Sequence, residues 1–287
     1  MKKLSILALC LTAALAGPAA AQAQDPLVEV LAVSQSITVN EASPRSLTLG
    51  CPGTSVAVSG SVTTGLGTLT DSIPRRGATH WTFRFNSQGG SQEVTGVLRC
   101  VRLNLPGGVD GVSLVVGSAI EPGVRVAAGK TERVAVGCPA DQVPTGWGFK
   151  RISGGNSIAV TAAAPSQAGW VFKLENRGSS AARVTPRIRC LASTQRASNG
   201  QRHSFSLREA SFVDRIGAGA NQAEAHACRD TEYSLSTGVS LDSADDILLR
   251  GTYPAGLRGG RWSFRQANGQ SAVKTTLLCL ASDTSFH

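Results

Sequence analysis

One pattern occurs three times in this chain: Trp81-Thr82-Phe83-Arg84, Trp170-Val171-Phe172-Lys173 and Trp262-Ser263-Phe264-Arg265. Each copy has a tryptophan, any residue, a phenylalanine and a basic residue. Aromatic side chains two positions apart share one face of a β-strand, so each copy predicts a strand with an aromatic face turned to a core. We expect these tryptophans to be core residues, because large apolar side chains that alternate along a strand are usually buried.

Cysteines flank each copy at a nearly constant distance. They form the pairs Cys51 and Cys100, Cys138 and Cys190, and Cys228 and Cys279. An asparagine also follows each tryptophan, at Asn86, Asn176 and Asn268. Tryptophans, cysteines and asparagines that recur together at one spacing indicate three tandem repeats. The economical pairing is one disulfide inside each repeat, which closes a loop of about 50 residues and contributes about 4 kcal/mol in the chain-entropy model.

The segments around these anchors read as strands. Apolar and polar residues alternate, glycine, asparagine, serine and proline interrupt the pattern every 8 to 12 residues, and no amphipathic run of helical length follows Gln24. We predict an all-β protein of three antiparallel β-sandwich-like units, over residues 24–110, 111–197 and 198–287. The joints contain Pro106-Gly107-Gly108 and the polar stretch 193–201. Because they are short, we expect the units to pack into a semi-rigid rod.

The N-terminal segment predicts export. Lys2 and Lys3 precede an uncharged apolar run, and Ala21-Gln22-Ala23 follows as a cleavage site. We expect residues 1–23 to be a signal peptide that carries Cys10 away, which leaves six cysteines for three disulfides. The apolar run is too short for a membrane anchor, so we expect no transmembrane segment in the mature chain, and a periplasmic or extracellular location.

The middle repeat resembles a known bacterial pattern. It opens with Cys138-Pro139, continues through a glycine-rich strand that contains Gly146-Trp147-Gly148, and closes with Gly169-Trp170, Asn176 and Cys190. This is similar to an uncharacterised Cys-Pro … Gly-Trp … Asn … Cys repeat of exported bacterial proteins. The first repeat shares the pattern in part, whereas the third begins Cys228-Arg229 and lacks the proline. The resemblance implies a small disulfide-closed β domain outside the cytoplasm and implies no reaction.

Positive charge is concentrated in the middle repeat. The mature chain has 26 basic and 19 acidic side chains, a net charge of +7, and residues 111–197 carry 11 basic against 4 acidic ones, while the other two units are neutral. Clustered arginine suits carboxylate and phosphate groups, so we predict a contact surface for an anionic envelope glycan or an acidic protein. Its candidate residues are Trp147, Lys150, Arg151, Arg183, Arg187 and Arg189. Ordinary solvated arginines are the alternative. Nucleic acid is not expected as a partner of an exported protein with two neutral units.

Catalytic and metal-binding motifs are missing from the sequence. The four histidines have no metal-ligand spacing, and no Gly-x-Ser-x-Gly or Gly-Lys-Ser/Thr motif occurs. Asp242, Asp245 and Asp246 form an acidic cluster without the order of a calcium loop, so we interpret it as a surface loop. We therefore predict a non-catalytic interaction protein without a cofactor. The alternatives are a structural subunit of an envelope or extracellular assembly and, third, a hydrolase with a site built from distant residues.

Overall fold

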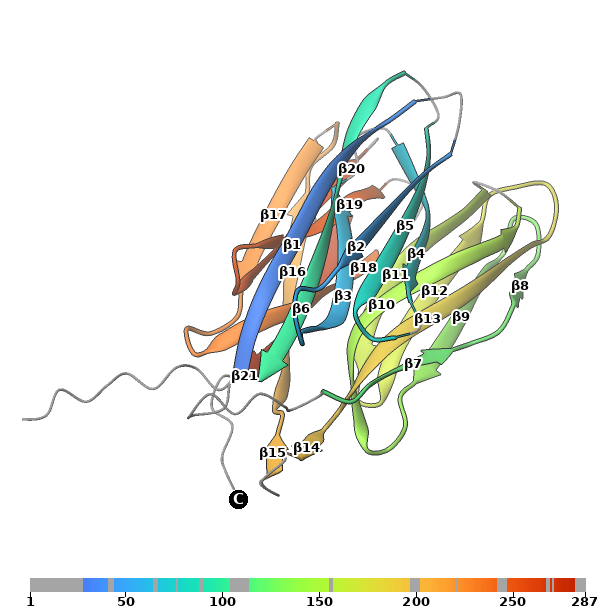
Figure 1. The fold of residues 1–287 in the computed structure, drawn as a ribbon. Coiled ribbons are helices and arrows are strands. Elements are labelled where there is room, and N and C mark those ends of the chain that lie inside the picture. Colours follow the sequence, from blue (N-terminus) through green and yellow to red (C-terminus); the bar gives the residue numbers. More distant parts are fainter. Residues whose placement is uncertain are drawn as a thin grey trace, which may run out of the picture.

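The computed structural model describes residues 28–281, apart from 41–43, 64–66, 76, 88–89, 104–113, 155–156, 197–201, 220, 242–246, 267–268 and 270. The predicted signal peptide, the Pro106-Gly107-Gly108 joint and the cluster of Asp242, Asp245 and Asp246 therefore lie outside the described residues. Every long element within them is a β-strand, so the all-β prediction is confirmed (Figure 1).

The first unit is a sandwich of two three-stranded antiparallel sheets. Its strands are β1 (Val28–Val39), β2 (Arg45–Gly50), β3 (Val56–Thr63), β4 (Gly67–Pro74), β5 (His80–Ser87) and β6 (Gln92–Leu103). One layer has the order β1-β6-β3 and the other β2-β5-β4. Trp81, Phe83 and Phe85 all project from β5 into the space between the layers, where none is exposed.

The second unit repeats this arrangement with an interrupted first strand. It consists of β7 (Val116–Ile120), β8 (Val124–Val126), β9 (Thr131–Gly137), β10 (Gln142–Ser153), β11 (Ile158–Ser166), β12 (Gly169–Asn176) and β13 (Ala182–Ala192). Pro122 and Gly123, which has a positive φ of 61°, separate β7 from β8. Asn176, one of the repeated asparagines, is buried and donates to the carbonyls of Val126 and Ser180, so this repeat anchor holds the turn after β12.

The third unit follows the same order. Its strands are β16 (Leu207–Ile216), β17 (Asn221–Ala227), β18 (Glu232–Leu241), β19 (Ile247–Ala255), β20 (Gly259–Gln266) and β21 (Ser271–Ala281). A short ladder of β14 (Thr194–Arg196) and β15 (Arg202–Ser204) lies between the second and third units, where the sequence predicts a polar joint. Trp170 and Trp262, like Trp81, are fully buried, as predicted for the core.

All three predicted disulfides are present. They join Cys51 to Cys100, Cys138 to Cys190 and Cys228 to Cys279, so each links the end of a second strand, in one layer, to the sixth strand of the other layer. Three structural disulfides indicate an oxidising, exported environment. In the described part of the chain there is no helix of the length and hydropathy needed to cross a membrane.

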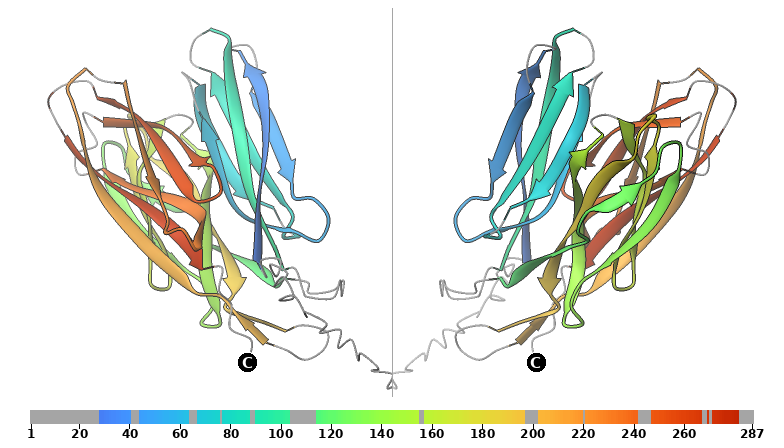
Figure 2. Two further views of the ribbon diagram at one scale, coloured as in Figure 1. Left: turned by 90° about the vertical axis from the view of Figure 1, so that its left-hand side faces the viewer. Right: turned by 90° about the vertical axis from the view of Figure 1, so that its right-hand side faces the viewer.

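The units form a closed ring, and the predicted rod is wrong. The third strand of each unit pairs with the fourth strand of another: β3 with β19, β10 with β4, and β18 with β11. Each unit therefore touches both of the others, and its two layers belong to two different six- or seven-stranded sheets (Figures 1 and 2). In each unit the third and fourth strands are edge strands of their layers, and each has a row of backbone N–H and C=O groups that no strand of the same unit pairs. Pairing between the units satisfies part of every one of these rows.

A fourth apolar cluster lies where the three units meet. Each third strand contains a β-bulge, and the residues at these bulges, Val58, Thr145 and Leu235, are completely buried. Around them pack apolar residues of all three units, among them Val101, Leu191 and Leu280, each of which follows the second cysteine of its unit. The bulges also exchange polar contacts, because Ser59 Oγ donates to the Leu235 carbonyl at 2.6 Å and Thr145 Oγ1 to the Val58 carbonyl at 3.1 Å.

Candidate interaction surface

The second unit carries its arginines on the face of β13 that points away from its own core. Ala182, Val184 and Ile188 are buried in that core. Because successive side chains on a strand point to opposite faces, Arg183 and Arg187 lie on the outer face. Arg183 is exposed and Arg187 half-buried. These two predicted residues are thus on a surface.

Lys150 lies on the same face, because it is directly opposite Thr185 of β13. On its other side Lys150 is opposite Asp71 of β4, so this part of the face borders the first unit. Asp71 is nearly buried and lies 3.5 Å from the exposed guanidinium of Arg84.

Arg125, which the sequence analysis did not single out, completes the surface. It is exposed on β8 and directly opposite Arg183 in the β8–β13 ladder. Residues in such a pair have Cβ atoms about 4.5–5.5 Å apart, and like charges there are destabilising. Within the described residues, neither arginine forms a salt bridge, and the exposed Glu121 of the β7–β8 turn forms none either. We call Arg125, Lys150, Arg183 and Arg187 the basic face.

Arg151 is a packing residue. Its guanidinium lies over the Phe149 ring, 5.7 Å from the centroid, and donates to the Ile158 carbonyl at 2.8 Å. Its backbone N–H donates to Asp71 Oδ1. Desolvation lowers the pKa of Arg151 to about 10, which leaves it charged at neutral pH. The side chain closes one end of the sandwich and is only partly open to a partner.

Arg189 is buried between the first two units, so its predicted place on an open surface is wrong. It is 2% exposed, and its guanidinium donates to Ser118 Oγ and to the Arg75 carbonyl, both at 3.0 Å. The Trp81 ring of the first unit lies 5.9 Å from it. Desolvation lowers its pKa to about 10. The outer face of β13 is covered here because the first unit packs on it.

Trp147 likewise lies at an interface between units, and its predicted exposure is wrong. The indole is half-buried, its Nε1 donates to the Thr237 carbonyl of the third unit at 2.7 Å, and it packs 6.2 Å from the Trp170 ring. The flanking glycines explain the error. A Cβ on Gly146 would lie 2.3 Å from the Val58 carbonyl oxygen, and one on Gly148 would lie 2.2 Å from that of Ser72. These glycines admit the backbone of the first unit and do not form an exposed loop.

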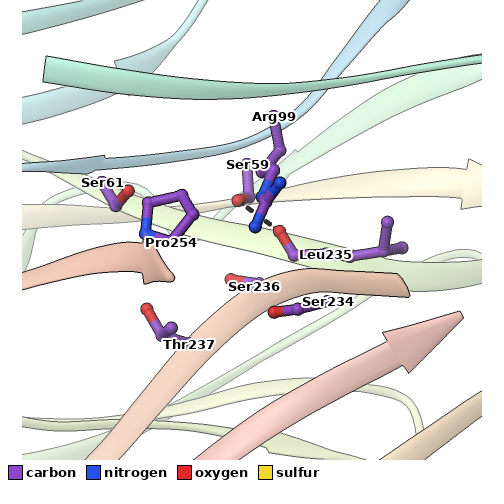
Figure 3. Close-up of a pocket in the computed structure, with 8 residues that line it drawn as sticks. All are labelled: Ser59, Ser61, Arg99, Ser234, Leu235, Ser236, Thr237 and Pro254. Atoms are coloured by element: carbon purple, nitrogen blue, oxygen red, sulfur yellow. Dashed lines mark hydrogen bonds between the residues drawn. The ribbon is translucent and has the colours of Figure 1, made fainter. Parts of the chain in front are cut away.

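Arg99 is a second arginine at an interface between units, and the sequence predicted no role for it. It precedes Cys100 as Arg189 precedes Cys190, and it is also 2% exposed. It lines a small pocket between the first and third units, with hydroxyl groups of β3 and β18 around it (Figure 3). The shared Arg-Cys dipeptide was the available signal for these joint arginines.

A polar cluster in the third unit was also missed. His226 Nε2 lies 2.9 Å from Asp214 Oδ1, and Thr275 Oγ1 donates to Asp214 Oδ2 at 2.8 Å. The first unit has Leu49 and Ile37 at the positions of His226 and Asp214, as counted from the two cysteines. Because the Thr275 hydroxyl is bonded to the carboxylate and not to the imidazole, this trio is not arranged as a nucleophile and its base.

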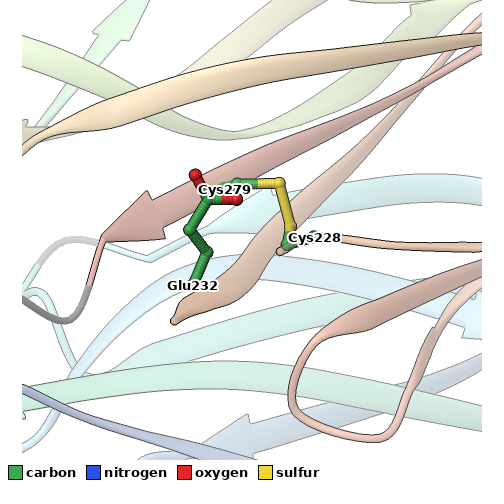
Figure 4. Close-up of side chains that lie close together, drawn as sticks. All are labelled: Cys228, Glu232 and Cys279. Carbon is green, nitrogen blue, oxygen red and sulfur yellow. A yellow bond between two sulfur atoms is a disulfide. The ribbon is translucent and has the colours of Figure 1, made fainter. Parts of the chain in front are cut away.

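One group of potential metal ligands occurs among the described residues, and its chemistry does not fit a metal. It consists of Cys228, Glu232 and Cys279 (Figure 4). Both sulfur atoms are in a disulfide, whereas a cysteine binds metal as a thiolate. The Glu232 carboxylate is held by Arg208 on both of its oxygens.

No protein-family model and no curated protein matches the chain. The resemblance of the middle repeat to a repeat of exported bacterial proteins therefore stays a prediction.

Proposed function

We propose that this protein is an exported, non-catalytic binding protein of the periplasm or cell exterior, and that it engages an anionic envelope polymer through the basic face. The observation that carries the proposal is the exposed Arg125–Arg183 pair. Two guanidinium groups directly opposite each other, neither of which forms a salt bridge with a described residue, weaken the ladder that bears them. An anion that bridges the two would remove this repulsion and gain two charge-assisted contacts.

Lys150 and Arg187 support the proposal by extending the positive charge along the same outer face toward the first unit. A repeating anionic polymer suits such a line of separate cations better than one compact ligand does. Each contact is weak in water, and several contacts along one chain add by effective concentration. The contacts of Trp147 and Arg189 with the neighbouring units confine the proposed surface to the outer part of the second unit.

The test measures binding of the mature chain to dextran sulfate, with neutral dextran as the uncharged polymer control. The variant is Arg125→Glu/Arg183→Glu. The matched control is Arg45→Glu/Arg265→Glu, which reverses two exposed arginines of the first and third units and changes the net charge equally.

We expect the Arg125/Arg183 variant to lose about tenfold or more in affinity, the equivalent of 1.4 kcal/mol, and the control variant to lose much less. Binding to the unmodified chain should weaken steeply as salt is added. Equal losses in the two variants would show that net charge alone attracts the polymer, and would refute the basic face.

A structural subunit is the second candidate, and the sheet edges favour it. β1, β2, β7, β9, β16 and β17 end the three large sheets, and each leaves one row of backbone groups open to another strand. Val213 on β16 is 72% exposed, which is unusual for a large apolar side chain on an edge strand. Light scattering of the purified mature chain distinguishes the two proposals: an oligomer of fixed stoichiometry that Val213→Lys dissociates favours the subunit, and a monomer at all concentrations counts against self-assembly.

A further inference from the structure

A buried positive charge lies at the interface between the first and third units and forms no salt bridge with a described residue. Arg99 is 2% exposed, and desolvation lowers its pKa to about 10, so it carries its charge at neutral pH. Its Nη2 donates to the carbonyls of Gly256 and Gly259. Its Nη1 is buried without a hydrogen-bond partner, and no carboxylate of the described residues forms a salt bridge with it. A buried charge left uncompensated is strongly destabilising.

Several residues with hydroxyl side chains line the pocket beside Arg99. Ser61 comes from β3 and Ser234, Ser236 and Thr237 from β18, so the two units each supply part of the lining (Figure 3). None of these four side chains makes a hydrogen bond in the described part of the chain. Ser59, also in the lining, already donates to the Leu235 carbonyl. In the β18–β21 ladder Ser234 and Thr237 lie opposite Cys279 and Leu277 of the third unit's core, which leaves Ser61 and Ser236 as the candidate donors to an anion. Hydroxyl donors beside a guanidinium make an environment that is complementary to negative charge.

The equivalent interface between the first and second units differs in the hydrogen bonds of its arginine and in the presence of an aromatic ring. There both terminal nitrogens of Arg189 have acceptors, and the face of Trp81 lies over its guanidinium. A cation over an aromatic face gains part of the stabilisation that an anion would give. The third unit has Leu278, 5% exposed, at this position and so places no charge in its joint. Arg99 combines a buried, unpaired terminal N–H with an adjacent pocket, whereas the buried, unpaired nitrogen of Arg189 is its Nε.

We propose that this pocket binds one compact anion of chloride size between Arg99 Nη1 and the hydroxyl group of Ser236. The space excludes a polyatomic anion, because its volume of about 10 Å³ is close to the least that one water molecule needs. Ser61 and Pro254, which are half-buried, form the side open to solvent, and rotation of the serine hydroxyls adapts the lining to a spherical ion. The bound anion would join the first and third units by contacting both. This proposal does not rest on the basic face.

The first test locates the ion. Crystals of the mature chain are soaked in sodium bromide, and the anomalous scattering of bromide is mapped. We expect a peak within hydrogen-bond distance of Arg99 Nη1 in the unmodified chain and in Arg189→Leu, and no peak in Arg99→Leu. The third unit shows that leucine fits at this repeat position, so Arg99→Leu should fold. A water molecule without anomalous signal at the site would overturn the proposal.

The second test measures binding in solution. Thermal unfolding is followed while chloride replaces gluconate, an anion too large for the pocket, at constant ionic strength. We expect Tm to rise by about 2–4 °C in the unmodified chain and in Arg189→Leu, and to stay constant in Arg99→Leu. A second variant, Ser236→Ala, should bind the ion more weakly and shift the titration to higher chloride.

An equal rise of Tm in Arg99→Leu would assign the effect to general salt action and overturn the site. A bromide peak without any rise of Tm in solution would mark an adventitious ion only and would also overturn it. Arg99→Leu should keep its affinity for dextran sulfate, so failure of one proposal does not imply failure of the other.

Discussion

Leu235→Ala is expected to loosen all three units at once. Leu235 is fully buried at the β18 bulge, in the cluster where the units meet. A buried leucine replaced by alanine costs about 2–5 kcal/mol, depending on how far the surroundings collapse into the space. Here the surroundings belong to three sandwiches fixed by their own disulfides and ladders, so collapse is restricted. We therefore expect a loss in the upper half of that range, about 3–5 kcal/mol.

The assay is native-state hydrogen exchange measured by mass spectrometry, supported by urea unfolding. Leu235→Ala should reduce amide protection in β3 and β10, in the first and second units, as well as in β18. The control is Leu277→Ala, which removes an equally buried leucine from the third unit's own core. It should reduce protection within β18–β21 and leave β3 and β10 close to normal. Identical exchange patterns in the two variants would refute the idea that the central cluster couples the units.

Two further predictions concern single side chains. The hydrogen bonds from Arg208 hold the pKa of Glu232 at about 2, below its ordinary 4.5, so the pair stabilises the fold above pH 4.5 and this stability is lost as the pH falls toward 2. Because Arg208 is about one third exposed, we expect about 1–2 kcal/mol, and Glu232→Gln should flatten the dependence of urea unfolding on pH over this window; an unchanged slope would contradict this. Gly60→Ala should cost about 1–3 kcal/mol, because the new Cβ would lie 2.6 Å from the Trp81 ring, while Gly217→Ala meets nothing within 4 Å and should leave Tm nearly unchanged. Thermal unfolding of both variants checks this, and equal Tm values would show that the Trp81 ring moves aside freely.

The repeat anchors made the interior of each unit predictable. Trp81, its two counterparts and the six cysteines occupy equivalent positions in three copies, and each is buried or disulfide-bonded within its own sandwich. The contacts between units were not predictable in the same way. They depend on backbone edges such as that of β3 against β19, and alternation of side chains does not encode which edges pair.

The candidate site was predictable only in its charge. The excess of basic residues in the second unit predicted a surface on β13, but Arg183 and Arg189 on one face have opposite surroundings, because a neighbouring unit covers only the latter. Trp147 suggested an exposed aromatic because glycines flank it. Those glycines leave room for the backbone of the first unit, and the local sequence does not reveal this contact. Arg125 was missed because its significance depends on lying opposite Arg183.

The closed ring has a consequence for how the joints vary. In a trimer of identical single-repeat chains, any residue placed at one joint would occur at all three, and a buried charge would be present three times. A single chain with three covalently linked copies is free of that constraint. Here the position before the second cysteine is Arg99, Arg189 and Leu278, so one joint holds a cation beside a pocket, one a cation beneath a tryptophan, and one an apolar contact. Linking the copies lets one interface specialise while the other two keep the ring closed.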